Sequence, residues 1–187
     1  MITPFIDIES SGLEPDKDLL LEVGVVVADL SSGEEVADFR FGLRYPGEVL
    51  DVVRDSCDPF VREMHDCSRL WLWLRNETDK VSPEGLDEAL CHIAGIWLPD
   101  KPPLANFNAP FDRRWLALWA PRFVSTCLNH RCFDCSTLRE TVAQIYPQGF
   151  GPQKQAEVHR AVPDARQALE YWRWYKAHVM SPYGRRV

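Results

Sequence analysis

The chain has 187 residues, 45% of them hydrophobic and 11% aromatic, which is enough apolar material to bury the core of one domain without a second. Its formal net charge of -7 argues against a protein that coats long duplex nucleic acid, because such a protein needs a basic surface to displace phosphate counterions. A small nucleic acid is not excluded, since bound divalent cations reverse the local charge of an acidic site.

Neither a membrane protein nor a secreted protein is expected. The most apolar run, LLLEVGVVVADL over residues 19–30, contains Glu22 and is too short to span a bilayer. The N-terminus lacks the basic region of a signal peptide. We therefore expect a cytoplasmic protein with no membrane partner, whose six cysteines are reduced thiols rather than a disulfide framework.

Three strands are predicted at the start of the chain, over residues 3–9, 19–30 and 35–45. The Gly-containing segments SSGLEPDKD and SSGEE mark the turns between them. The second strand is nearly continuous in β-branched and apolar residues, which suits a central strand buried on both faces.

The remainder of the chain alternates helices with strands. Residues 48–75 have a helical pattern, and a second helix starts at the cap formed by residues 82–84. There follow a strand over 103–107, a helix in PFDRRWLALW, a short strand and a capped helix in CFDCSTLRETVAQIY, and a closing helix in PDARQALEYWRWYKAH. This order predicts one α/β domain over residues 1–178 and a C-terminal tail over residues 179–187.

Two carboxylates stand one residue apart on the first predicted strand. Side chains alternate along a strand, so Asp7 and Glu9 project from the same face, and no basic residue is close to them in the sequence. Like charges held side by side destabilise a fold unless a cation lies between them. The pair is therefore either a solvated polar face or half of a metal site.

Three further residues have ordinary explanations when each is taken alone. Asp112 and Asp164 each fall in the first turn of a predicted helix, where the helix dipole favours an acid. His159 precedes the last helix, where a histidine is usually a surface or hydrogen-bonding group. Together, D-x-E on the first strand, NAPFD at a helix start and H-x4-D at the last helix fit the DEDDh exonuclease pattern in the same order.

The chain resembles the oligoribonucleases of the DEDDh superfamily over nearly its whole length. The matching segments are FIDIESSGL with DLLLEVGVVVADL, then VREMHDCSRL, FDRRWL, RCFDCSTLRE and HRAVPDAR. The resemblance implies a ribonuclease H-like fold: a mixed five-stranded sheet flanked by helices, in which an antiparallel meander of three strands is joined by two parallel strands.

The resemblance also implies a 3′–5′ exoribonuclease that hydrolyses short single-stranded RNA, dinucleotides included, to nucleoside 5′-monophosphates. Two divalent cations, Mg²⁺ or Mn²⁺, take oxygen ligands and lie about 3.5–4 Å apart in such sites. By resemblance, Asp7 bridges both cations, Glu9 and Asp164 complete one coordination shell, and Asp112 holds the second ion directly or through water. His159 would be the general base that acts on the attacking water.

The substrate-binding residues implied by the resemblance also have structural explanations. Leu13 matches a leucine that wedges against the bases, although it could simply pack the turn. His65 matches a histidine near the substrate. Arg131 and Ser136 match a phosphate-binding cluster that is partly supplied across a homodimer, but they also suit a surface ion pair and a helix cap.

Two departures from the family affect the phosphate-binding cluster. His130 stands where a tyrosine is expected, and Asn108 occupies a serine position, within a segment closer to ribonuclease T and polymerase proofreading domains. A single-stranded DNA or proofreading-type exonuclease is therefore one alternative function. A noncatalytic nucleic-acid-binding module on the same fold is another, although such a module would be expected to have lost an acidic ligand.

A competing metal site is suggested by CLNHRCFDC, which holds Cys127, His130, Cys132 and Cys135. The C-x2-C spacing is common among zinc ligands. A second C-x2-C is missing, however, and a strand through this segment would direct Cys132 and Cys135 to opposite faces.

Overall fold

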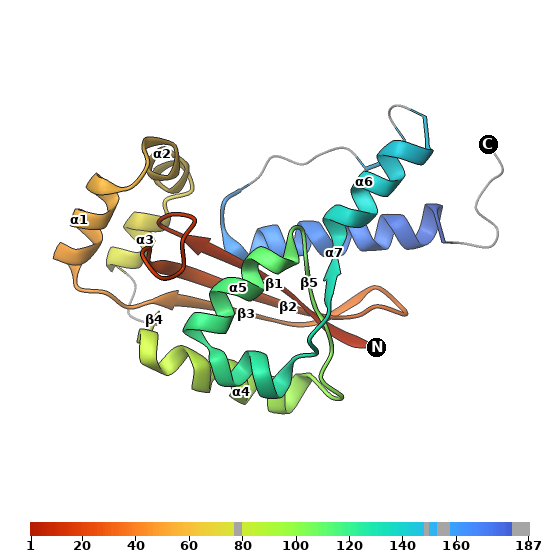
Figure 1. Cartoon of the computed structure of the whole chain (residues 1–187), viewed down its shortest axis with the longest axis horizontal. Coiled ribbons are helices and arrows are strands. Elements are labelled where there is room, and N and C mark those ends of the chain that lie inside the picture. The colour runs from red at the N-terminus through yellow and green to blue at the C-terminus, as the bar shows by residue number, and fades with distance from the viewer. Residues whose placement is uncertain (77–79, 148–149, 153–157, 181–187) are drawn as a thin grey trace.

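The computed structural model describes residues 1–76, 80–147, 150–152 and 158–180. The mixed α/β fold predicted from the sequence is confirmed (Figure 1). Most of the predicted tail, residues 181–187, lies outside the described residues.

A mixed sheet of six strands forms the centre of the molecule, in the order β4-β3-β2-β1-β5-β6. Strands β1 (Ile2–Ser10), β2 (Leu20–Asp29) and β3 (Glu34–Leu43) form the predicted antiparallel meander. Strands β5 (Leu104–Asn106) and β6 (Cys132–Asp134) extend the sheet in parallel from β1. Every residue of β2 up to Ala28 is buried, as its apolar sequence predicted.

The predicted number of five strands is wrong because a sixth strand, β4 (Lys80–Val81), pairs in parallel with the end of β3. Two residues are too few to produce an alternating pattern, so the pairing partner defines this strand rather than its own sequence.

The predicted helical region over residues 48–75 consists of three short helices, α1 (Gly47–Ser56), α2 (Pro59–Cys67) and α3 (Leu70–Asn76). The later helices are η1 (Pro83–Gly85), α4 (Leu86–Trp97), α5 (Ala109–Trp119), the π-helical η2 (Phe123–Cys127), α6 (Cys135–Ile145) and α7 (Ala161–His178). None of the described helices combines the length and the apolar character needed to cross a bilayer.

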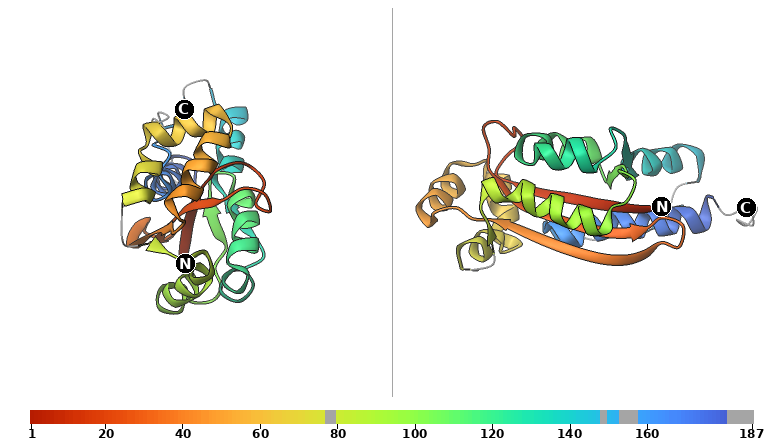
Figure 2. Two further views of the ribbon diagram at one scale, coloured as in Figure 1. Left: turned by 90° about the vertical axis from the view of Figure 1, so that its left-hand side faces the viewer. Right: turned by 90° about the horizontal axis from the view of Figure 1, so that it is seen from below.

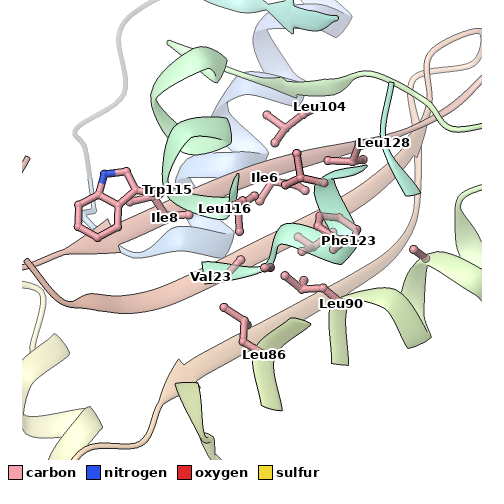
Figure 3. Close-up of a cluster of buried hydrophobic side chains, with 14 of the residues drawn as sticks. Ile6, Ile8, Val23, Leu86, Leu90, Leu104, Trp115, Leu116, Phe123 and Leu128 are labelled. Atoms are coloured by element: carbon pink, nitrogen blue, oxygen red, sulfur yellow. The ribbon is translucent and has the colours of Figure 1, made fainter. Parts of the chain in front are cut away.

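Helices cover both faces of the sheet (Figure 2). On one face, α4, α5 and η2 pack against Ile6 and Ile8 of β1 in a cluster that includes the fully buried Trp115 (Figure 3). On the other face, α7 packs against Phe5 of β1 and Val26 of β2. Because side chains alternate along a strand, Asp7 and Glu9 face the same side as Phe5, toward the layer formed by α7.

Candidate active site

Three carboxylates converge where β1 meets the start of α7. Asp7 and Glu9 come from β1 and Asp164 from the first turn of α7. One ligand oxygen from each lies within 4.8 Å of the other two, which makes them a set that could hold a metal ion. In the part of the chain that the structure describes, no other group of three or more His, Cys, Asp or Glu residues meets this condition.

A glycine on β2 allows α7 to come this close. Gly24 pairs with Asp7 across the two strands, and a Cβ added to Gly24 would lie 2.4 Å from the backbone C of Ala161 and from the backbone N of Val162. No side chain fits in that space. The direct backbone contact brings the first turn of α7, and with it Asp164, over the carboxylates of β1.

Asp112 approaches the same place from the first turn of α5. Its Oδ1 accepts a hydrogen bond from the backbone N–H of Ile8, at 3.1 Å. The Nδ2 of Asn106 donates to Asp7 Oδ1 at 2.8 Å and to Asp112 Oδ2 at 3.3 Å. Asp112 therefore lies next to the set of three carboxylates and is joined to Asp7 through an amide.

Burial and mutual repulsion act together on these acids. The pKa of Asp7 is raised well above its ordinary value by burial first, and then by the charges of Asp112 and Glu9. Burial, followed by the charges of Asp164 and Glu22, likewise raises the pKa of Glu9. Burial also raises the pKa of Asp112. Carboxyl groups with strongly perturbed pKa values are typical of functional sites. Here a bound cation would offset the excess negative charge.

The loop before α7 places His159 beside the carboxylates. His159 has a left-handed backbone, with φ of 53°, and lines the same cavity as Asp7, Glu9 and Asp164. The backbone N–H groups of Val158 and Arg160, on either side of it, both donate to the carboxylate of Asp164. The loop conformation is therefore tied to a predicted metal ligand.

Arg160 anchors this loop to the sheet. Its guanidinium donates two hydrogen bonds to the fully buried Glu22 of β2, at 3.0 and 2.9 Å, and Glu22 also accepts from the backbone N–H of Ala161. Glu22 lies opposite Glu9 across the two strands, and the charge of Arg160 lowers the pKa of Glu9. A positive group that is remote in the sequence thus lies near Glu9.

Asp7, Glu9 and Asp164 line a cavity of about 760 Å³. This is within the usual range of small-molecule sites, about 300–1,000 Å³. Asn108 and Ser136 lie in its wall, and the backbone N–H of Asn108 donates to the Ser136 hydroxyl at 2.9 Å. Tyr171 and Arg139, whose guanidinium lies over the Phe107 ring, also line the cavity.

The other three predicted substrate-binding residues are not among the described residues that line this cavity. Leu13 is 68% exposed, and its carbonyl accepts a hydrogen bond from Arg114. Arg131 is exposed on the surface. His65 is buried, with Nε2 2.9 Å from the Ser10 carbonyl and Nδ1 3.8 Å from Glu9 Oε2, and burial lowers its pKa. A role for these three in binding substrate stays a prediction.

The cysteine-rich segment is divided between two parts of the core. Cys132 packs against the cluster on the α4 and α5 face, whereas Cys135 is buried in the cluster on the α7 face. Cysteines on opposite faces of a sheet cannot both reach one ion, so this arrangement does not suit the alternative zinc site.

Three residues of the site were not predicted from the sequence. Asn106 bridges two carboxylates, Arg139 lines the cavity, and Arg160 anchors the His159 loop. Asn106 had one available signal, since it ends a strand predicted to be parallel, and residues at the carboxyl ends of such strands often face ligands. For Arg160, the only signal in the sequence was its position next to His159.

Comparison with solved structures shows which fold the chain shares. The chain is similar in fold to the zinc-bound form of the E. coli exonuclease I complex with single-stranded DNA, with a TM-score of 0.71, 13% identity, and coverage of 97% of this chain and 42% of that one. Exonuclease I from Methylocaldum szegediense gives a TM-score of 0.70 at 12% identity, over 96% of this chain and 41% of that one. This chain thus spans about two-fifths of those proteins and shares the exonuclease fold.

Comparison with sequences identifies the family, although no family model matches the chain. An oligoribonuclease from Cutibacterium acnes is 33% identical over 185 residues, covering 90% of this chain and 83% of the relative. An oligoribonuclease from Burkholderia lata is 28% identical over 179 residues, covering 95% of this chain and 84% of the relative. The human mitochondrial oligoribonuclease is 26% identical over 177 residues, covering 94% of this chain and 72% of the relative. The chain belongs to the oligoribonuclease family.

Proposed function

We propose that this protein is a metal-dependent 3′–5′ exoribonuclease that hydrolyses short single-stranded RNA to nucleoside 5′-monophosphates. The observation that carries the proposal is the convergence of ligand oxygens of Asp7, Glu9 and Asp164 to within 4.8 Å of one another, in the wall of a cavity that His159 also lines. Membership of the oligoribonuclease family supports the same reaction and substrate.

The donor set suits hard divalent cations. Carboxylate oxygens are the ligands that Mg²⁺ and Mn²⁺ prefer. Burial and neighbouring carboxylates raise the pKa values of Asp7 and Glu9, even though the charge of Arg160 lowers that of Glu9, so bound cations would relieve the remaining repulsion. Asp7, Glu9 and Asp164 would hold one cation, and Asp7 with Asp112 a second. When bound, two such cations stabilise the attacking and the leaving oxygen of a phosphoryl displacement.

The remaining roles fall to side chains and loops of the chain. A ring nitrogen of His159 would accept the proton of the attacking water, the usual role of histidine in general-base catalysis. The Ser136 hydroxyl and the amide of Asn108 line the cavity where a substrate phosphate can accept hydrogen bonds. Leu13, His65 and Arg131 would contact the rest of the substrate.

Product analysis on three substrates tests the proposal. A 5′-phosphorylated RNA dinucleotide, a long single-stranded RNA and a single-stranded DNA are incubated with Mg²⁺, with Mn²⁺ or with EDTA. We expect nucleoside monophosphates to be released fastest from the dinucleotide and not at all in EDTA. Equal rates on all three substrates would favour a general single-strand exonuclease instead.

Two variants assign the activity to the site. Asp7→Asn removes a shared carboxylate ligand and should abolish hydrolysis, whereas Asp16→Asn, at an exposed turn residue, should leave it unchanged. Near-normal hydrolysis by Asp7→Asn would contradict the assignment. Absence of hydrolysis by the parent protein under every condition would favour a noncatalytic binding module.

We further propose that the protein is a homodimer, because the phosphate-binding cluster implied by the family resemblance is completed across two subunits. Light scattering on the purified protein tests this, and a mass near the monomer's 21.5 kDa would contradict it. A cytoplasmic location remains a prediction from the sequence.

A further inference from the structure

The side chain of Asn106 holds two acids together at the centre of the candidate site. Asn106 ends β5, the strand next to β1, and is only 1% exposed. Its Nδ2 donates to Asp7 Oδ1 at 2.8 Å and to Asp112 Oδ2 at 3.3 Å. Because a primary amide has two N–H bonds on one nitrogen, it can serve both carboxylates at once.

The surroundings fix the orientation of this amide. The Oδ1 atom of Asn106 is buried and has no hydrogen-bond partner among the residues that the structure describes, which is unfavourable for a polar atom. Turning the amide over would place Oδ1 against two carboxylate oxygens and would lose both hydrogen bonds. The side chain thus leaves its carbonyl unpaired and keeps Nδ2 between Asp7 and Asp112.

A neutral donor at this point has a specific advantage. Asp7 and Asp112 belong to different elements, and like charges would drive their side chains apart in the absence of a cation. A lysine or arginine would hold them together but would also compete with a metal ion for the same oxygens. An amide joins them without adding charge.

We infer that Asn106 is a positioning residue that holds Asp7 and Asp112 ready to bind divalent cations. This inference rests on the proposed function, since it assumes that the two carboxylates are metal ligands. Partners that orient metal ligands usually account for about 10–100-fold in metal affinity or activity. The two hydrogen bonds of Asn106 go to Asp7 and Asp112, so we assign it a role through these carboxylates.

Calorimetric titration with Mn²⁺ alone tests the inference without using activity. We expect Asn106→Leu, which keeps the volume and removes the donor, to bind Mn²⁺ about 10–100-fold more weakly than the parent. Asn106→Ser keeps a single O–H donor and should give an intermediate affinity. The matched control is Asn76→Leu, at an exposed helix end, which should bind Mn²⁺ as the parent does.

Kinetics provide a second measurement. In Asn106→Leu, kcat should fall and should partly recover as Mn²⁺ is raised, while the KM for RNA stays close to that of the parent. A purely structural role would lower the melting temperature and leave Mn²⁺ affinity unchanged. Parent-like Mn²⁺ affinity in the folded Leu or Ser variant would overturn the inference. Failure of the parent itself to bind Mn²⁺ would instead overturn the proposed function.

Discussion

The anchor between Arg160 and Glu22 allows a quantitative prediction. Glu22 is fully buried, and two of its hydrogen bonds come from Arg160, whose side chain is 15% exposed. Arg160→Met keeps an apolar chain of similar length but removes the cation. Removing one partner of a buried pair usually costs about 3–5 kcal/mol, because the remaining charge is left uncompensated.

The contacts that remain place the expected loss at the low end of this range. In Arg160→Met, Glu22 keeps the backbone N–H of Ala161, and the largely exposed Arg40 lies 3.9 Å away. The Trp73 ring loses one of its two flanking guanidinium groups. We therefore expect the free energy of unfolding to fall by about 3 kcal/mol.

Urea denaturation near pH 7.5 measures this loss of unfolding free energy. The slope of the unfolding free energy against urea concentration should be unchanged. The matched control is Arg54→Met, because Arg54 makes an equally close bidentate pair with Asp66 in which both side chains are exposed, 39% and 40%. Arg54→Met should lower the free energy of unfolding by about 1 kcal/mol or less. Adding Glu22→Gln to Arg160→Met should recover stability, because the unpaired buried charge is removed. A loss for Arg160→Met no larger than that of the control would refute the reasoning.

Three further predictions follow from the same site. Burial and repulsion raise the pKa values of Asp7, Glu9 and Asp112, so folding favours their protonated forms. The contribution of these three groups to stability is therefore largest below the ordinary carboxyl pKa and is lost as pH rises, and the melting temperature of the metal-free protein should fall from pH 5 to pH 8. With saturating Mn²⁺, the melting temperature should no longer fall over this pH range. A melting temperature that rises from pH 5 to pH 8 in the absence of metal would contradict the prediction. Gly24→Ala should displace the first turn of α7 and lower both the free energy of unfolding and the rate of hydrolysis. The control Gly95→Ala lies inside α4 with open space around it, and it should raise the free energy of unfolding, measured in urea, by about 0.5–1 kcal/mol. His159→Ala should lower the rate about 10²–10⁴-fold, with calorimetric Mn²⁺ binding retained, and a smaller effect would exclude it as general base.

Local patterns in the sequence determine much of this structure. Alternation alone placed Asp7 and Glu9 on one face of β1, and helix-start signals placed Asp112 and Asp164 in first turns, as the structure shows. These features depend only on neighbouring residues, so a single sequence is sufficient to predict them. That the acids lie together was predicted from the family resemblance, not from these patterns.

The features that sequence analysis missed depend on pairing between distant segments. Strand β4 exists because Lys80 and Val81 lie beside the end of β3. Arg160 meets Glu22 across 138 positions of the chain, and Asn106 meets Asp7 across 99. No local periodicity contains such pairings, because each depends on which strands become neighbours in the sheet.

Strand β1 explains how the site is combined with a stable fold. Ile6 and Ile8 lie in the apolar cluster beneath α4 and α5, so one face of the strand contributes to the core. The opposite face carries the repelling carboxylates, whose cost is partly offset by the hydrogen bonds of Asn106 and by the charge of Arg160. These two supports come from β5 and from the loop before α7, and neither is a predicted metal ligand. Mutations at either support should therefore weaken the site while every predicted metal ligand remains in place.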